Sequence, residues 1–241
     1  MPENIILSDR DHKKRLKERF KRNVFTDFHN HEILELILTY AVPKKDVKLL
    51  ANALVKRFKG LRGVFDATQE ELKSVDGIGQ NAALLIQLIK NVAGEYLKET
   101  MMGKDVIRNP KEVLDYLKLK LSGERVEKFL AIYLNSKNEV LAIEILHEGT
   151  INQTVVYPRK VIELAFRHNA RSIIFVHNHP SGDATPSALD KNLTMILDRA
   201  ALAVDIIVHD HLIIGKNVYF SARENGWIIG CPTRATRSVA H

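Results

Sequence analysis

Residues 172–190 read SIIFVHNHPSGDATPSALD, and the rest of the chain is best interpreted outward from them. The apolar, largely β-branched run 172–176 predicts a short buried strand. His177 and His179 follow this run two residues apart. Because side chains two apart on a strand point to the same face, the two imidazoles are expected to converge on one point.

A helix is predicted directly after this loop. Thr185 and Pro186 have the residue types of an N-cap and a first helical position. Ser187 and Asp190 are three residues apart and therefore share one face of that helix. Two imidazoles and one carboxylate are a suitable zinc ligand set, and a fourth position left open for water is typical of a catalytic site. The predicted metal ligands are His177, His179 and Asp190.

The spacing His-x-His, seven residues, Ser-x-x-Asp resembles the signature of the JAB1/MPN/Mov34 metalloenzymes, the JAMM proteases. The full string 177–190 resembles the bacterial RadC branch of that family, and the resemblance extends over most of the chain. It implies an MPN fold, which is a cytidine-deaminase-like α/β domain with a mixed sheet. It also implies one zinc ion per chain, with another divalent metal as the alternative, and hydrolysis of peptide or isopeptide bonds in a peptide or protein substrate.

The resemblance further implies a general base, which in JAMM enzymes is a Glu at the start of an early strand. Glu127 directly precedes the apolar run 129–134 and matches that place, and Glu124 is the alternative three residues earlier. Ser187 is expected to hydrogen-bond the oxyanion that forms when water attacks a carbonyl. The segment His209-Asp210-His211 is interpreted as supporting the site or fixing a turn.

The composition narrows the class of protein. A chain of 241 residues with 45% hydrophobic residues can form a substantial core and is not disordered. The single cysteine, Cys231, excludes an internal disulfide. We find no apolar run long enough to span a membrane and no signal-type N-terminus, so we expect a cytoplasmic protein without a membrane partner. The net charge of +7 favours an acidic partner, and nucleic acid is the first candidate.

The N-terminal half contains two features typical of nucleic-acid contact. Lys13, Lys14 and Arg15 begin a basic run that suits phosphates. Gly77-Ile78-Gly79 precedes a long apolar helix and resembles the helix-hairpin-helix motif, whose backbone N–H groups suit a phosphate. Gln80 and Asn81 stand where such motifs often carry Lys or Arg. DNA is therefore a candidate partner through this half, by way of Lys13, Lys14, Arg15, Gly77 and Gly79.

The expected segments are a basic arm over 1–24, a helical helix-hairpin-helix domain over 25–98, a linker over 99–108, the metalloenzyme domain over 109–231 and a tail over 232–241. In the metalloenzyme domain, the pattern predicts a first helix, a hairpin, a third strand near 154–157 and a helix from Pro158. The strand bearing the histidines and its helix follow, and then strands at 205–208, 212–214 and 218–221. This order predicts helices packed on a mixed sheet.

Two other metal chemistries are excluded. An HNH nuclease spreads its motif over a long ββα element, whereas these histidines are almost adjacent. A barrel amidohydrolase needs about 250 residues, and this domain is far shorter. Two hypotheses remain: a zinc hydrolase of peptide or isopeptide bonds, and a DNA-binding or DNA-repair accessory protein whose metal site is structural or vestigial.

Overall fold

The residues that the computed structural model describes are 2–42, 46–108, 110–149, 156–216 and 218–228. They form two compact units that divide between Ala93 and Gly94. Part of the predicted third strand, near 154–157, and the whole predicted tail over 232–241 lie outside the described residues.

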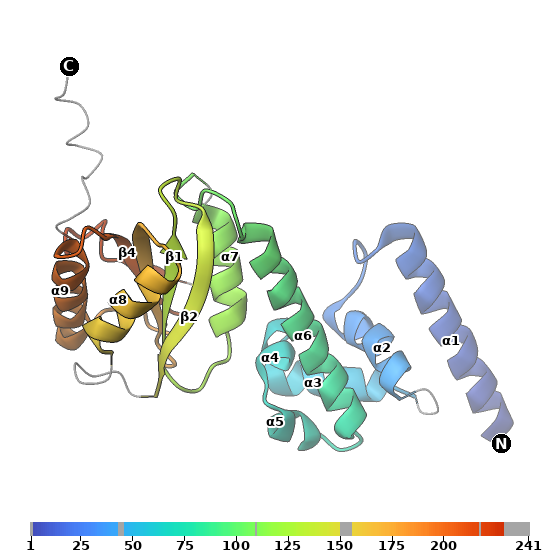
Figure 1. The fold of residues 1–241 in the computed structure, drawn as a ribbon. Coiled ribbons are helices and arrows are strands. Elements are labelled where there is room, and N and C mark those ends of the chain that lie inside the picture. Colours follow the sequence, from blue (N-terminus) through green and yellow to red (C-terminus); the bar gives the residue numbers. More distant parts are fainter. Residues whose placement is uncertain (1, 43–45, 109, 150–155, 217, 229–241) are drawn as a thin grey trace. The chain divides into compact units, whose positions relative to one another are not determined.

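The first unit is helical, as predicted (Figure 1). Its elements are α1 (Pro2–Asn23), α2 (Asn30–Ala41), α3 (Lys48–Phe58), α4 (Leu61–Asp66), α5 (Gln69–Lys73) and the first part of α6 (Gln80–Met101). Aliphatic side chains of α2 to α6, such as Leu34, Leu54 and Ile86, form its core. A capping box opens α5, where Thr68 and Glu71 accept each other's backbone N–H.

The second unit is an α/β domain built on a mixed sheet, which confirms the predicted fold class. Its elements are α7 (Pro110–Leu121), β1 (Lys128–Leu134), β2 (Val140–Glu148), α8 (Pro158–Arg167), β3 (Ser172–Asn178), α9 (Ala188–Leu202), β4 (Ile207–Ile214) and β5 (Tyr219–Ser221), together with the end of α6. The strand order is β2-β1-β3-β4-β5. Only the β3–β4 pair is parallel, and the other neighbours are antiparallel.

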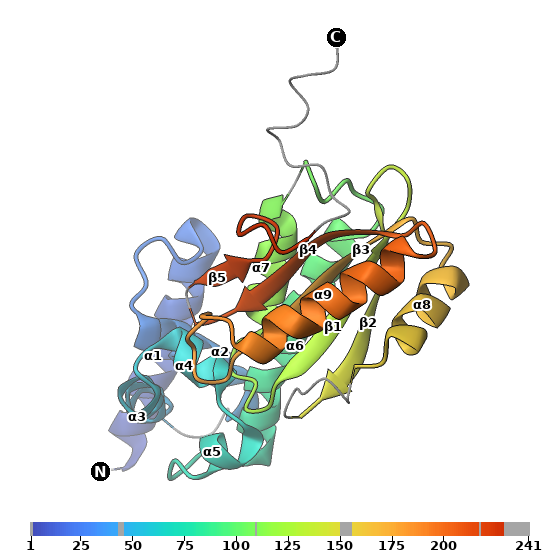
Figure 2. The same ribbon diagram turned by 90° about the vertical axis from the view of Figure 1, so that its left-hand side faces the viewer.

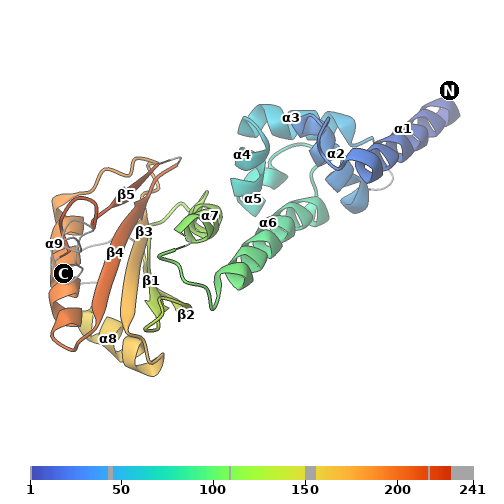
Figure 3. The ribbon, with the colours of Figure 1, turned by 90° about the horizontal axis from the view of Figure 1, so that it is seen from above.

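Helices cover both faces of this sheet. Figures 2 and 3 show α8 and α9 on one face and α7 on the other. Side chains of β1 alternate between these two layers because successive residues of a strand point to opposite faces. Phe129 and Tyr133 join the core beneath α8 and α9, whereas Leu130 and Ile132 pack on the α7 side.

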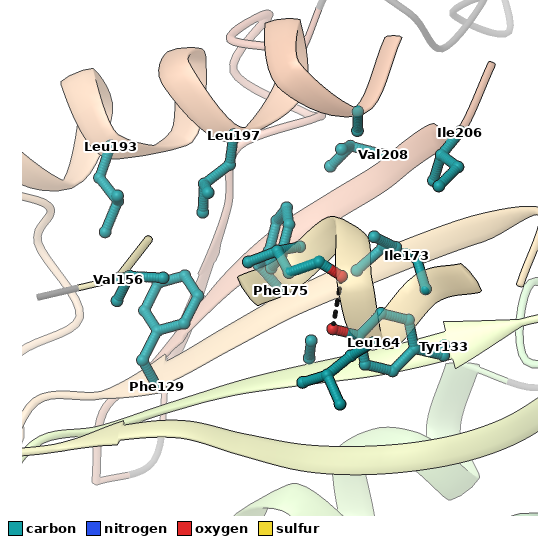
Figure 4. Packing of buried hydrophobic residues seen from close by; sticks show 14 of the residues in the cluster. Phe129, Tyr133, Val156, Leu164, Ile173, Phe175, Leu193, Leu197, Ile206 and Val208 are labelled. Carbon is teal, nitrogen blue, oxygen red and sulfur yellow. Dashed lines mark hydrogen bonds between the residues drawn. The ribbon is translucent and has the colours of Figure 1, made fainter. Parts of the chain in front are cut away.

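The core beneath α8 and α9 is well packed. Figure 4 shows Leu193 and Leu197 of α9 pointing toward Phe129 and Phe175 of the sheet. The hydroxyl of Tyr133, which belongs to the same cluster, donates a hydrogen bond of 3.1 Å to the Val161 carbonyl oxygen of α8. This core supports the end of β3 that carries the histidines.

One expected break in the sheet does not occur. The sequence predicted two strands, 205–208 and 212–214, separated at 209–211, but β4 is continuous from Ile207 to Ile214. Its register against β3 shifts by one residue, because Ile173 pairs with Val208 and Ile174 with Asp210. A bulge of this kind changes the face on which later residues lie. Val208 and His211 therefore both join the α9 side of the sheet, although they are three residues apart.

Candidate metal centre

The three predicted ligands come together at one end of the sheet. His177 is the second-to-last residue of strand β3, His179 follows that strand, and Asp190 lies in the first turn of α9. They are the one group of three or more His, Cys, Asp and Glu residues, among those the structure describes, whose ligand atoms lie within 4.8 Å of one another. His177 is 1% exposed and Asp190 is 6% exposed, so His179 forms the open side of the cluster.

The distances within this cluster fit a small tetrahedral ion. His177 Nε2 lies 3.0 Å from His179 Nε2 and 3.3 Å from Asp190 Oδ1, and His179 Nε2 lies 3.6 Å from Asp190 Oδ2. Atoms held at about 2.0–2.1 Å by one tetrahedral zinc ion are separated by about 3.3 Å. The nearest nitrogen and oxygen atoms of the three residues are thus close enough together for the cluster to hold a metal ion.

A buried hydrogen-bond chain sets the tautomer of His177. The Thr194 hydroxyl donates to the Asp190 carbonyl oxygen at 2.6 Å, so it accepts from His211 Nδ1, also at 2.6 Å. His211 Nε2 then accepts from His177 Nδ1 at 2.9 Å. Since Nδ1 of His177 carries the proton, its Nε2 offers a lone pair to the cluster.

The loop after β3 fixes His179 in the same way. Its Nδ1 donates to the Asp183 carbonyl oxygen at 2.8 Å, which leaves Nε2 as an acceptor. The Asp183 carboxylate holds the turn by accepting from the backbone N–H and the hydroxyl of Thr185. Two imidazole lone pairs are thus directed at each other beside a carboxylate, and a cation between them would satisfy all three groups.

The start of α9 differs from the prediction, which placed the N-cap at Thr185 and the first helical residue at Pro186. Ser187 is the N-cap. Its hydroxyl accepts from Asp190 N–H at 3.1 Å, and the Asp190 carboxylate accepts from Ser187 N–H at 2.7 Å. This reciprocal capping box satisfies two donors at once, whereas the Thr185 hydroxyl is bonded to Asp183. The capping box also fixes the orientation of the Asp190 carboxylate.

The electrostatics of the centre favour an ionised carboxylate and a neutral supporting ring. Burial alone would raise the pKa of Asp190, but the adjacent imidazoles of His177 and His179 hold it well below its ordinary value. The helix N-terminus acts in the same direction. Complete burial, together with the neighbouring His177, lowers the pKa of His211 well below its ordinary value and keeps this ring neutral.

Glu127 is near the cluster, whereas Glu124 is paired with a lysine. Phe129 pairs with His177, so the same antiparallel register, continued by two residues, brings Glu127 opposite His179. The pKa of His179 is raised first by the adjacent Asp190 carboxylate and, to a lesser extent, by the charge of Glu127. Glu124 instead pairs with Lys128 at 3.0 Å.

Asn178 joins the strand of the histidines to the strand of Glu127. Its side-chain oxygen accepts from Lys128 N–H at 2.8 Å, and its amide donates to the Val126 carbonyl oxygen at 3.2 Å. These two bonds fix the backbone of the residues directly before and after Glu127. In addition, the Gly149 N–H donates to the Glu127 carbonyl oxygen at 2.8 Å. The backbone at Glu127 is therefore held from two sides.

The hydrogen-bond chain that supports His177 contains one residue that the sequence analysis had noted and one that it had not. His211 was interpreted as supporting the site, and it contacts His177 directly. Thr194 was missed. Its spacing of four residues after Asp190 was the available signal, because it places both on one face of a helix.

The N-terminal residues singled out for nucleic acid belong to the first unit, whereas the cluster belongs to the second. Lys13, Lys14 and Arg15 belong to α1, and Gly77 and Gly79 lie in the turn before α6. Gly77 has a φ of +85°, and a Cβ there would come within 2.6 Å of a Leu50 methyl group. Packing thus explains this glycine, because a side chain would be both strained and obstructed.

None of the described helices is both long and apolar enough to cross a membrane.

Comparisons with known proteins agree with this geometry. A family described as RadC-like JAB domain matches residues 107–227, and one described as UPF0758 N-terminal matches residues 7–84. A UPF0758 protein of Fusobacterium nucleatum subsp. nucleatum is 38% identical over 232 residues, which cover 92% of this chain and 100% of the relative. UPF0758 proteins of Nitrosospira multiformis and Ruegeria pomeroyi are 38% and 37% identical, over 93% and 91% of this chain and 100% and 98% of their own lengths. The chain therefore belongs to the UPF0758 family, whose second domain is a RadC-like JAB domain.

Proposed function

We propose that this protein is a zinc-dependent hydrolase of peptide or isopeptide bonds. The observation that carries the proposal is the convergence of His177, His179 and Asp190 at separations of 3.0–3.6 Å, with both imidazole acceptors directed into the cluster. A zinc ion held by these residues would activate a water molecule and polarise the carbonyl group under attack.

Glu127 is the proposed general base and acid. Its position opposite His179 lets it take a proton from the attacking water and return that proton to the leaving amine. Asn178 supports this role because its two hydrogen bonds hold the backbone on both sides of Glu127. Glu124 is a poor alternative, since its carboxylate is paired with Lys128.

Ser187 is the proposed donor to the oxyanion. In the structure its hydroxyl donates to Asp190 Oδ2 at 2.7 Å, and its backbone N–H donates to the same oxygen at 2.7 Å. The hydroxyl can rotate toward a substrate while the backbone N–H continues to hold the carboxylate. The arrangement therefore supports a donor that turns toward the substrate when the substrate binds.

Cleavage of a proteome-derived peptide library, read by mass spectrometry, tests the proposal. The library should include peptides joined through a Lys side chain, so that isopeptide bonds are sampled. We expect zinc-dependent cleavage by the full chain and by Glu124→Gln, and a loss of about 10²–10⁴-fold in Glu127→Gln. Cleavage that persists in Glu127→Gln or His179→Ala, or a library left intact by the zinc-loaded protein, would overturn the proposal.

A further inference from the structure

A groove of about 530 Å³ lies between α1 and α2 of the first unit, and the metal site does not include it. One wall is formed by lysines of α1, and the other includes Leu36 and Tyr40 of α2. The lysines that line it are Lys13, Lys14, Lys17 and Lys21. Its volume is in the range of small-ligand sites.

The two helices that form the groove are held together by specific contacts. Leu16 of α1 is only 3% exposed and anchors that helix in the unit. His12 lies 2.7 Å from the buried Glu35, and Arg19 lies 2.7 Å from Glu32. Lys14 and Lys21 of the groove wall are both exposed to solvent.

The groove has a strong positive charge. The only carboxylate among its described lining residues is Glu18, which pairs with Lys21 at 2.9 Å on the surface. Exposed pairs of this kind contribute little to stability and break readily when a stronger partner is available. Lys13 and Lys21 are eight residues apart, so the lysines extend over about 12 Å of the helix axis. An anionic chain rather than a single small anion suits a row of this length.

Tyr40 adds a flat apolar surface beside this charge. The residue is 69% exposed. Lys17 Nζ lies 4.7 Å from the centre of its ring and covers one face. The exposure of the residue leaves the other face open to solvent. The lysine also restricts the ring, so less conformational entropy is lost when a planar group stacks on it.

We propose that this groove binds single-stranded nucleic acid, with phosphates on the α1 lysines and one base stacked on Tyr40. Positive charge that follows the backbone, combined with an exposed aromatic ring, is the arrangement that binds single strands with little dependence on base sequence. Duplex DNA does not use such a ring, because its bases are already stacked on one another. An acidic peptide could satisfy the lysines but offers no base to Tyr40.

The test is fluorescence anisotropy of the full chain with a labelled oligonucleotide of twelve thymidines, beside a blunt duplex and polyglutamate as competitors. We expect the single strand to bind with a salt slope of about −0.7 per phosphate contact. Tyr40→Ala should weaken binding about tenfold or more, whereas Tyr40→Phe should bind like the wild type. Because Tyr40 is mostly exposed, the thermal unfolding of both variants should match that of the wild type.

Matched charge variants locate the site. Lys14→Gln should weaken binding and reduce the salt slope, and Lys73→Gln on α5, which removes the same charge near the turn at Gly77 and Gly79, should not. Four results would overturn the proposal: no salt-sensitive binding of the single strand, Tyr40→Ala binding like the wild type, tighter binding of the duplex or polyglutamate, or an equal effect of the two lysine variants.

Discussion

Replacing Thr194 by valine removes the end of the hydrogen-bond chain that orients His177, and it changes little else. Valine has nearly the same shape as threonine, and this position is completely buried, so no cavity forms. The change deletes two hydrogen bonds of 2.6 Å, one to the Asp190 carbonyl oxygen and one from His211 Nδ1. The Asp190 oxygen keeps its intrahelical partner, but His211 Nδ1 loses its acceptor in a fully buried ring.

The expected consequences are both thermodynamic and chemical. An unsatisfied buried donor costs about 1–3 kcal/mol, so the free energy of unfolding should fall by that amount. If His211 instead moves its proton to Nε2, it donates to His177 Nδ1, and His177 must then carry its own proton on Nε2. The metal-directed lone pair is lost in that arrangement. Changes in such supporting residues typically reduce metal affinity by about 10–100-fold.

Two measurements follow these effects separately. Competition with a chromophoric chelator gives the zinc affinity, and urea denaturation in the presence of EDTA gives the stability of the metal-free protein. Thr194→Ser is the matched control, because it keeps the hydroxyl and loses the methyl group. We expect Thr194→Ser to retain zinc affinity and Thr194→Val to lose it. If Thr194→Val binds zinc as tightly as the wild type, the hydrogen-bond chain does not set the ligand tautomer.

Three further perturbations test other parts of the structure. Asn178→Ala should lower the free energy of unfolding, measured in urea, by about 1–3 kcal/mol, because Lys128 N–H loses its acceptor. The same variant should reduce the rate of hydrolysis more than the zinc affinity. Unchanged hydrolysis would contradict the supporting role of this amide. Burial, helped by the charge of Glu144, raises the pKa of Tyr133, so the folded state holds the phenol proton more tightly than the unfolded state. The resulting stability is present below about pH 10 and is lost as the pH rises above it. In pH-dependent urea titrations, Tyr133→Phe should remove this loss of stability at alkaline pH. Gly77→Ala should lower the free energy of unfolding by about 1–3 kcal/mol, since the added methyl group combines a positive φ with a close contact. Gly79→Ala, whose methyl group meets nothing within 4 Å, should change it by no more than about 0.5 kcal/mol. Equal shifts in the melting temperature would refute this explanation of Gly77.

The ligand cluster could be predicted because its information is local in the sequence. His177 and His179 are two residues apart at the end of an apolar strand, and Asp190 follows in the first turn of the next helix. Short-range periodicity places such residues without any knowledge of the rest of the sheet. The helical first unit and the mixed sheet of the second follow from the same kind of pattern.

The supporting residues could not be derived in this way. His211 reaches His177 only because β4 lies parallel to β3 and carries a bulge that returns His211 to the α9 side of the sheet. A one-residue shift of register is invisible in a hydrophobic pattern, which is why β4 was expected as two strands. The N-cap was misplaced for a related reason. Thr185 and Ser187 are both good caps, and the reciprocal bond with Asp190 decides between them.

The groove between α1 and α2 illustrates the same limit in the first unit. The sequence identifies the basic run, but not which of its residues share a wall with an aromatic ring. Lys17 and Tyr40 are far apart in the chain, and the ion pair between Arg19 and Glu32 is among the contacts that bring their helices together. The charge in the sequence thus indicates an anionic partner, whereas the position of the Tyr40 ring favours a single strand over a duplex.

The central claim is that His177, His179 and Asp190 bind a metal ion. Metal content measured by mass spectrometry on untagged protein purified without chelators tests it most directly, with His179→Ala as the matched variant. The proposed function predicts about one zinc ion per chain in the wild type and its loss in the variant. A wild-type protein that carries no metal, even after zinc is supplied, would contradict the account.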